Sequence, residues 1–133
     1  MEARRLAVGI DEALRGSGHG GKVDVRVLIN EDTVGAKSFS LLVNTVKAGD
    51  DCLNTQEGAL GHKHAIEHGM YCLSGRGAMV ISGVKYNVKP GTAVFVPANE
   101  WHYVENHSTD EDLRYIIFYV PGGEEQEFLA KKK

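Results

Sequence analysis

Four histidines have the spacing of a metal site. The segment GHKHAIEHGMYCLSGRG, residues 61–77, contains His62, His64 and His68. The segment GTAVFVPANEWHYVEN, residues 91–106, contains His102. Neutral imidazole is the commonest protein ligand for transition metals. The sequence therefore predicts a metalloprotein in which these four rings bind one ion.

The spacing suits a β-sheet that carries all four rings on one face. Residues two apart in a strand point to the same side, so His62 and His64 can reach one metal together. His68 is also an even number of residues away from them, so the same alternation can place it on that side. A single buried histidine is more often a hydrogen-bonded core residue than a ligand, because a buried polar ring needs a partner. Four histidines of compatible parity favour a metal site.

The elements that must position these rings are short strands. Apolar and polar residues alternate from Val23 onwards, and turn signals such as Ser82-Gly83 and Lys89-Pro90-Gly91 separate the segments. This pattern predicts an all-β sandwich or barrel. The expected strands cover residues 23–30, 38–49, 68–74, 76–82, 84–88, 92–96, 101–106 and 113–120.

The ends of the chain have a different character. Residues 3–15 place Leu6, Ile10 and Leu14 at helical spacing and predict a short helix. The run GSGHGG, residues 16–21, has the composition of a flexible linker. We expect an N-terminal segment and linker over 1–21, one β-barrel domain over 22–122 and a charged C-terminal tail over 123–133.

Composition excludes several classes of protein. A chain of 133 residues with 42% hydrophobic residues forms one domain with one core. The net charge of −3 and the absence of a basic patch argue against nucleic-acid binding. No apolar run has the length of a membrane span. Two cysteines, Cys52 and Cys72, do not make a disulfide framework, so we expect a cytoplasmic protein.

The two histidine segments resemble the paired motifs of the cupin superfamily. Its first motif is H-x-H, three or four residues, a glutamate, six residues and a glycine. Its second is a glycine, five residues, P-x-G, two residues, a histidine, three residues and an asparagine. The matching positions here are His62, His64, His68 and Gly75, then Gly91, Pro97, Asn99, His102 and Asn106. The resemblance implies a double-stranded β-helix, or jelly-roll barrel.

Three positions depart from the family pattern. The family's first motif also has a glycine ahead of its H-x-H; that position is Gln56 here, and the glycine falls at Gly58 instead. Asn99 replaces a glycine, and asparagine tolerates the left-handed backbone of a tight turn. His68 occupies the glutamate position; Glu67 is a rival ligand, but it is one residue short of the distance to Gly75 and has the wrong parity. The resemblance therefore implies an all-histidine site.

Four neutral ligands leave a divalent metal with its full charge. Such an ion lowers the pKa of bound water and attracts anionic or oxygen-chelating substrates. Nitrogen donors suit Fe, Mn, Ni, Cu, Co or Zn, and argue against Ca or Mg. An octahedral ion would keep two positions open for substrate, whereas a tetrahedral zinc would be closed and structural.

Other pocket residues carry weaker signals. The predicted lining of the site comprises Met70, Cys72, Phe95, Ile116 and Phe118. The candidate proton donors or acceptors are Glu100, Tyr103 and Tyr115. Each of these residues also fits an ordinary packing or surface role, and core packing is the better explanation for Met70 and Cys72.

Three functions are compatible with this site. The first is an oxidoreductase, a dioxygenase that uses one redox metal, which the resemblance to small all-histidine cupins favours. The second is a non-redox isomerase, lyase or cyclase in which the metal is a Lewis acid. The third is a non-catalytic metal- or ligand-binding module. The resemblance also implies a homodimer formed through edge strands, with residues 23–30 as the candidate edge.

Overall fold

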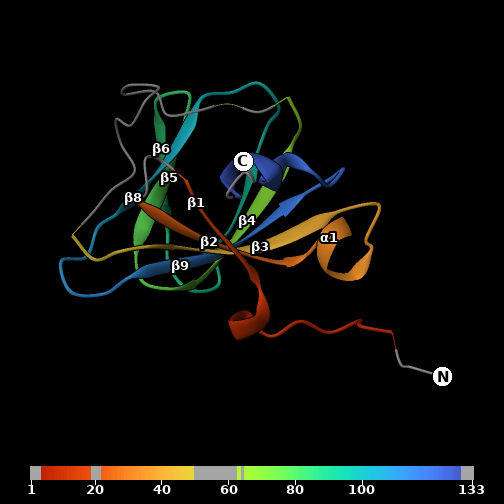
Figure 1. Cartoon of the computed structure of the whole chain (residues 1–133). Helices are drawn as coiled ribbons and strands as arrows, with labels where there is room; N and C mark the ends of the chain where they lie inside the picture. Colours follow the sequence, from red (N-terminus) through yellow and green to blue (C-terminus); the bar gives the residue numbers. More distant parts are fainter. Residues whose placement is uncertain (1–3, 19–21, 50–62, 64, 130–133) are drawn as a thin grey trace.

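Nine strands dominate the part of the chain that the computed structural model describes, which comprises residues 4–18, 22–49, 63 and 65–129. Their order along the chain is visible in Figure 1. The strands are β1 (Leu14–Gly18), β2 (Val23–Ile29), β3 (Ser40–Val46), β4 (His68–Ser74), β5 (Gly77–Ile81), β6 (Val84–Val88), β7 (Ala93–Val96), β8 (His102–Asn106) and β9 (Leu113–Tyr119).

The strands form two antiparallel sheets. One has six strands in the order β1-β2-β3-β9-β4-β7, and the other has three in the order β6-β5-β8. The long step from β3 to β9 places the two chain halves side by side in one sheet. This arrangement confirms the predicted all-β jelly-roll fold.

Alternating burial fills the space between the sheets. In β2 the buried residues are Val23, Val25 and Val27, each at most 1% exposed, and the residues between them are partly exposed. The same period-two pattern in β9 buries alternate residues from Leu113 to Tyr119. Removal of apolar side chains from water is the main favourable contribution to such a core.

The N-terminal predictions are wrong for the described residues. A 3-10 turn, η1 (Ile10–Glu12), replaces the expected helix, and β1 follows it directly. The glycines at positions 16 and 18 are strand residues that pair with β2, not part of a flexible linker. They permit close packing, because a Cβ at Gly16 would overlap the backbone carbonyl of Phe128. Residues 19–21 lie outside the described residues.

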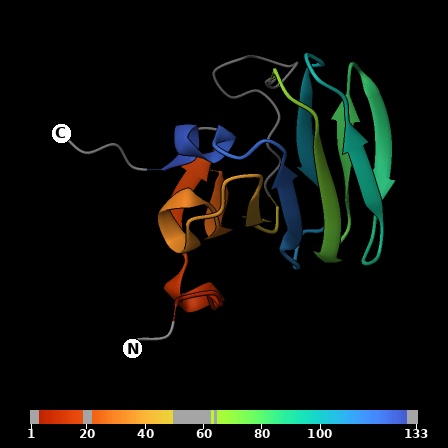
Figure 2. The ribbon, with the colours of Figure 1, turned by 90° about the vertical axis from the view of Figure 1, so that its right-hand side faces the viewer.

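The start of the expected C-terminal tail is folded as well. A 3-10 helix, η3 (Glu124–Phe128), lies beside β1, as Figure 2 shows, and Leu129 bridges Gly16. The side chain of Glu125 is buried and accepts a hydrogen bond of 2.9 Å from Nδ2 of Asn30. Asn30 also caps the short helix α1 (Glu31–Val34) by accepting from the backbone N–H of Thr33.

The sheet edges differ from the expectation. The strand over residues 23–29 is internal, because β1 pairs with one side of it and β3 with the other. The six-stranded sheet ends instead at β1 and β7. No helix in the described ranges has the length and apolar character needed to cross a membrane.

Candidate metal centre

Two of the four predicted ligands lie together inside the barrel. His68 begins β4 in the larger sheet, and His102 begins β8 in the smaller sheet. Their ring centroids are 4.9 Å apart, and the rings are inclined at 59°. Both side chains are buried, with 6% and 5% of their surface exposed. The two sheets thus bring residues 34 positions apart in the sequence to one point.

A backbone hydrogen bond sets the tautomer of His102. Its Nδ1 lies 3.0 Å from the carbonyl oxygen of Glu100. A carbonyl can only accept, so Nδ1 carries the proton, and Nε2 of the neutral ring keeps its lone pair. Metal-binding histidines are commonly oriented in this way. His102 is therefore prepared to ligate through Nε2.

The separation of the two rings fits ligation of one ion. With a metal–nitrogen bond of about 2.1 Å, two imidazoles on one metal have centroids about 4.5 Å apart at a right angle and about 5.2 Å apart at the tetrahedral angle. The observed distance falls between these values. His62 and His64 lie outside the described residues, and no third metal-binding side chain joins the pair within the described ranges.

Glu67 has a different environment from His68. Its side chain is exposed, whereas the next residue is buried. Glu67 lines a groove on the outside of the barrel with Phe95 and Phe118, and His68 also contributes to that groove. This position follows from the strand alternation that turns His68 inwards.

A small cavity adjoins the histidine pair. Its volume is about 30 Å³, close to the volume that one water molecule occupies in the liquid. Two elements that the sequence did not connect with the site, β1 and η3, contribute to its wall beside β9. The lining residues are Gly18, Val23, Val25, Asn44, His68, Met79, His102, Val104, Tyr115, Ile117, Tyr119 and Phe128.

Tyr119 places a phenol beside the histidines. Its ring centroid is 5.3 Å from that of His68, with which it pairs across the sheet. Burial raises the pKa of Tyr119 well above its usual value, and the nearby Glu127, Tyr115 and Glu124 raise it further. The hydroxyl therefore stays protonated at neutral pH and can act as a hydrogen-bond donor.

Of the three catalytic candidates, the structure brings only Tyr115 to the cavity. The side chain of Glu100 accepts a hydrogen bond of 3.1 Å from Ser82 and lines an outer groove. Tyr103 follows the inward-facing His102 in β8 and does not line the cavity. Glu100 contributes to the site through its backbone carbonyl, a role that residue type alone does not reveal.

Three of the predicted pocket residues, Phe95, Ile116 and Phe118, do not line the cavity. Phe95 and Phe118 are 60% and 39% exposed on the outer face of the larger sheet, where both are paired with Gly69. Ile116 has the same outward parity in β9. Met70 and Cys72 point inwards but belong to the packed core rather than to the cavity wall. Burial raises the pKa of the Cys72 thiol, which suits this packing role.

Among the residues with polar side chains that line the cavity, the sequence interpretation missed Tyr119 and Asn44. Tyr119 had a usable signal, because it continues the inward parity of Tyr115 along β9. Asn44 also had one: it is a polar residue at an inward position of the largely apolar strand SLLVNTV.

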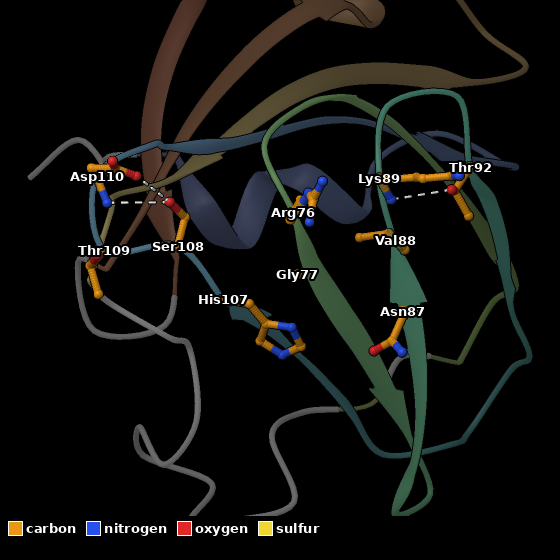
Figure 3. Close-up of a pocket in the computed structure, with 10 residues that line it drawn as sticks. All are labelled: Arg76, Gly77, Asn87, Val88, Lys89, Thr92, His107, Ser108, Thr109 and Asp110. Carbon is orange, nitrogen blue, oxygen red and sulfur yellow. Dashed lines mark hydrogen bonds between the residues drawn. The ribbon is translucent and has the colours of Figure 1, made fainter.

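A larger depression at the other end of β8 does not contain the paired imidazoles or the phenols of the small cavity. It is an open polar groove of about 1000 Å³, shown in Figure 3, and it includes Arg76, Lys89 and His107. Some of its polar side chains are bonded to near neighbours in the sequence; Ser108, for example, donates to Asp110 over 2.8 Å. The small buried cavity, with its paired imidazoles and phenols, is the better candidate for chemistry.

Comparisons with known proteins agree with this geometry. A family model described as a cupin domain matches residues 52–125. An L-ectoine synthase of Vibrio campbellii is 30% identical over 100 residues, which cover 73% of this chain and 69% of that protein. An L-ectoine synthase of Vibrio cholerae is 33% identical over 100 residues, covering 73% of this chain and 63% of that protein.

Solved structures share the fold at lower identity. A cupin from Shewanella frigidimarina, described as RmlC-like, has a TM-score of 0.68 and 16% identity, with 95% of this chain and 99% of that chain covered. The polyketide cyclase RemF from Streptomyces resistomycificus has a TM-score of 0.68 and 23% identity, with 90% and 80% covered.

Proposed function

This chain belongs to the cupin superfamily, and from that premise we propose that it is a non-redox, metal-dependent enzyme of the cyclase or lyase type, similar in activity to L-ectoine synthase. The observation that carries the proposal is the buried cavity in which His68 and His102 face two tyrosines. The sequence relatives support a cyclase-type reaction rather than the dioxygenase that the sequence first favoured.

The proposed metal ligands are His62, His64, His68 and His102. A divalent transition metal in this position would supply Lewis-acid polarisation of a substrate carbonyl. The ion is one of Fe, Mn, Ni, Cu, Co or Zn, and an open coordination position is part of the proposal. Catalysis by a Lewis acid requires no change of oxidation state, which suits a ring-forming reaction.

The protein side chains have separate roles in this proposal. The protonated hydroxyl of Tyr119 donates a hydrogen bond to the substrate oxygen on which negative charge develops. The apolar wall, which includes Val25, Val104 and Ile117, excludes bulk water and strengthens that bond. The carbonyl of Glu100 holds the His102 ring in its ligating tautomer.

Metal content tests the ligand set. His102→Ala should abolish stoichiometric metal binding, measured by mass spectrometry of the purified protein. Glu67→Gln is the matched control and should retain the metal, because Glu67 is exposed on the outside of the barrel. Full retention of metal in His102→Ala would contradict the four-histidine site.

Ligand binding tests the reaction type. L-ectoine, the product named for the relatives, should bind to the metal-loaded protein and bind more weakly to the metal-free protein in calorimetric titrations. The metal-loaded protein should consume no dioxygen during these titrations. Dioxygen consumption together with absence of L-ectoine binding would favour the dioxygenase instead.

We also propose a cytoplasmic homodimer, with the contact moved from residues 23–30 to the outer face of β4, β7 and β9. Phe95, Phe118 and Val120 are exposed on this face, at 60%, 39% and 62%. Phe95 and Phe118 pair with Gly69 from either side, which leaves a groove between the two aromatic rings. An apolar groove of this kind can pack against its own copy across a two-fold axis.

A further inference from the structure

Three buried asparagines differ in how their side chains are bonded. Asn106 is 8% exposed, and its Nδ2 donates to the carbonyl oxygens of Val46, Lys47 and Glu111 at 3.0–3.1 Å. Its Oδ1 accepts from the backbone N–H of Ser108. The Asn30 side chain likewise has both a donor and an acceptor bond. These two amides are structural.

Asn44 has no such bonds. It is 7% exposed, and its Oδ1 is fully buried without a hydrogen-bond partner in the described part of the chain. A buried carbonyl oxygen that lacks a partner lowers stability, because it has lost its water and gained nothing in return. Such groups are uncommon in native structures and need an explanation.

The position of Asn44 in the barrel explains why its side-chain oxygen is left without a partner. The residue points inwards from β3 and pairs with Val25 on one side and Tyr115 on the other. All three residues line the cavity that contains His68 and His102. The unsatisfied amide therefore shares the cavity with the candidate metal centre.

We propose that Asn44 determines substrate specificity: its Oδ1 accepts a hydrogen bond from an N–H or O–H group of the substrate held against the histidine pair. This inference rests on the proposed function, since it assumes that the cavity, about 30 Å³ in this structure, widens to admit substrate and is the reaction site. It names the substrate class as a small molecule with an amine, amide or hydroxyl donor beside its reacting carbonyl.

A substitution that removes the amide separates this role from a structural one. In metal-free protein, Asn44→Leu should raise the thermal midpoint by about 3 °C, since an unsatisfied polar group is replaced by an apolar one of similar size. Asn106→Leu is the matched control and should lower the midpoint by about 5 °C or more, because its satisfied bonds are lost. In metal-loaded protein, Asn44→Leu should weaken L-ectoine binding about tenfold or more.

A second probe keeps the inference separate from the proposed function. Formamide carries an N–H donor in the smallest amide, and its titration into isotope-labelled wild-type protein should shift the side-chain amide signals of Asn44 but not those of Asn106. If formamide shifts Asn44 while L-ectoine does not bind, the proposed function fails and the role of Asn44 stands.

Three results would overturn the inference. One is a lower thermal midpoint for Asn44→Leu, which would make the amide structural. Another is unchanged L-ectoine affinity in that variant, which would mean that the amide makes no contact with the ligand. The third is an Asn44 signal that moves with neither probe.

Discussion

Gly75 and Gly91 form a matched pair for testing how the cupin motifs shape the barrel. Both have positive φ angles, +87° and +95°, which favour glycine. They differ in the space around them. A Cβ at Gly75 would overlap the carbonyl oxygen of Asp112 and lie 2.8 Å from Cα of Leu113, whereas nothing lies within 4 Å of a Cβ at Gly91.

The expected losses of stability follow from this difference. Gly91→Ala has only the left-handed backbone to accommodate, at about 1–2 kcal/mol, partly offset by a less flexible unfolded chain. Gly75→Ala has the same cost and also forces two backbone segments apart, which adds about 1–3 kcal/mol. We therefore expect Gly75→Ala to be about 1–3 kcal/mol less stable than Gly91→Ala.

Equilibrium unfolding in denaturant measures both values. Trp101 is the only tryptophan and provides the fluorescence signal. In both variants the free energy of unfolding should fall with denaturant concentration at the wild-type slope. Their unfolding midpoints then report changes in stability alone. Equal losses, within about 0.5 kcal/mol, would refute the reasoning, because the close approach of β4 to the Asp112–Leu113 backbone would then have no energetic effect.

Three further outcomes are expected. Tyr119→Phe should lower the maximal turnover rate by about 100-fold while metal content is retained, because the phenol is the proposed donor; an unchanged rate would exclude that role. Phe95→Lys should convert the dimer to a monomer in light scattering without loss of metal, and a persistent dimer would place the contact elsewhere. For Glu105, burial alone would raise the pKa, but hydrogen bonds from His107 and Lys85 lower it below its usual 4.5. Its ion pairs thus stabilise the fold above that pH and are lost as the pH falls through the lowered value, so wild type should exceed Glu105→Gln in thermal midpoint at neutral pH and lose the advantage in acid. A constant difference from neutral pH into acid would contradict this linkage.

The strands were largely predictable because their periodicity is local. The alternation in β2 and β9 and the Gly and Pro turn signals determine where strands lie without any knowledge of their partners. The left-handed backbone of Asn99, φ +63°, was predictable for the same reason, as asparagine adopts it readily.

The features that were missed depend on contacts distant in the sequence. Gly16 looks like a linker residue until Phe128 is packed against it. Parity along β9 places Phe118 on the face opposite Tyr115. The sequence does not show that the face of Phe118 is the outer one, because this depends on how β9 pairs with β4. The unpartnered oxygen of Asn44 is likewise visible only when the whole cavity wall is assembled.

The central claim is that the histidine cavity performs non-redox, ring-forming chemistry. It is tested most directly by incubating metal-loaded protein with L-ectoine under strictly anaerobic conditions and following the ligand by proton NMR. The account predicts conversion in the reverse, ring-opening direction, at the same rate with and without dioxygen, and none in the His102→Ala variant. Absence of conversion by the metal-loaded wild type, or conversion that requires dioxygen, would contradict it.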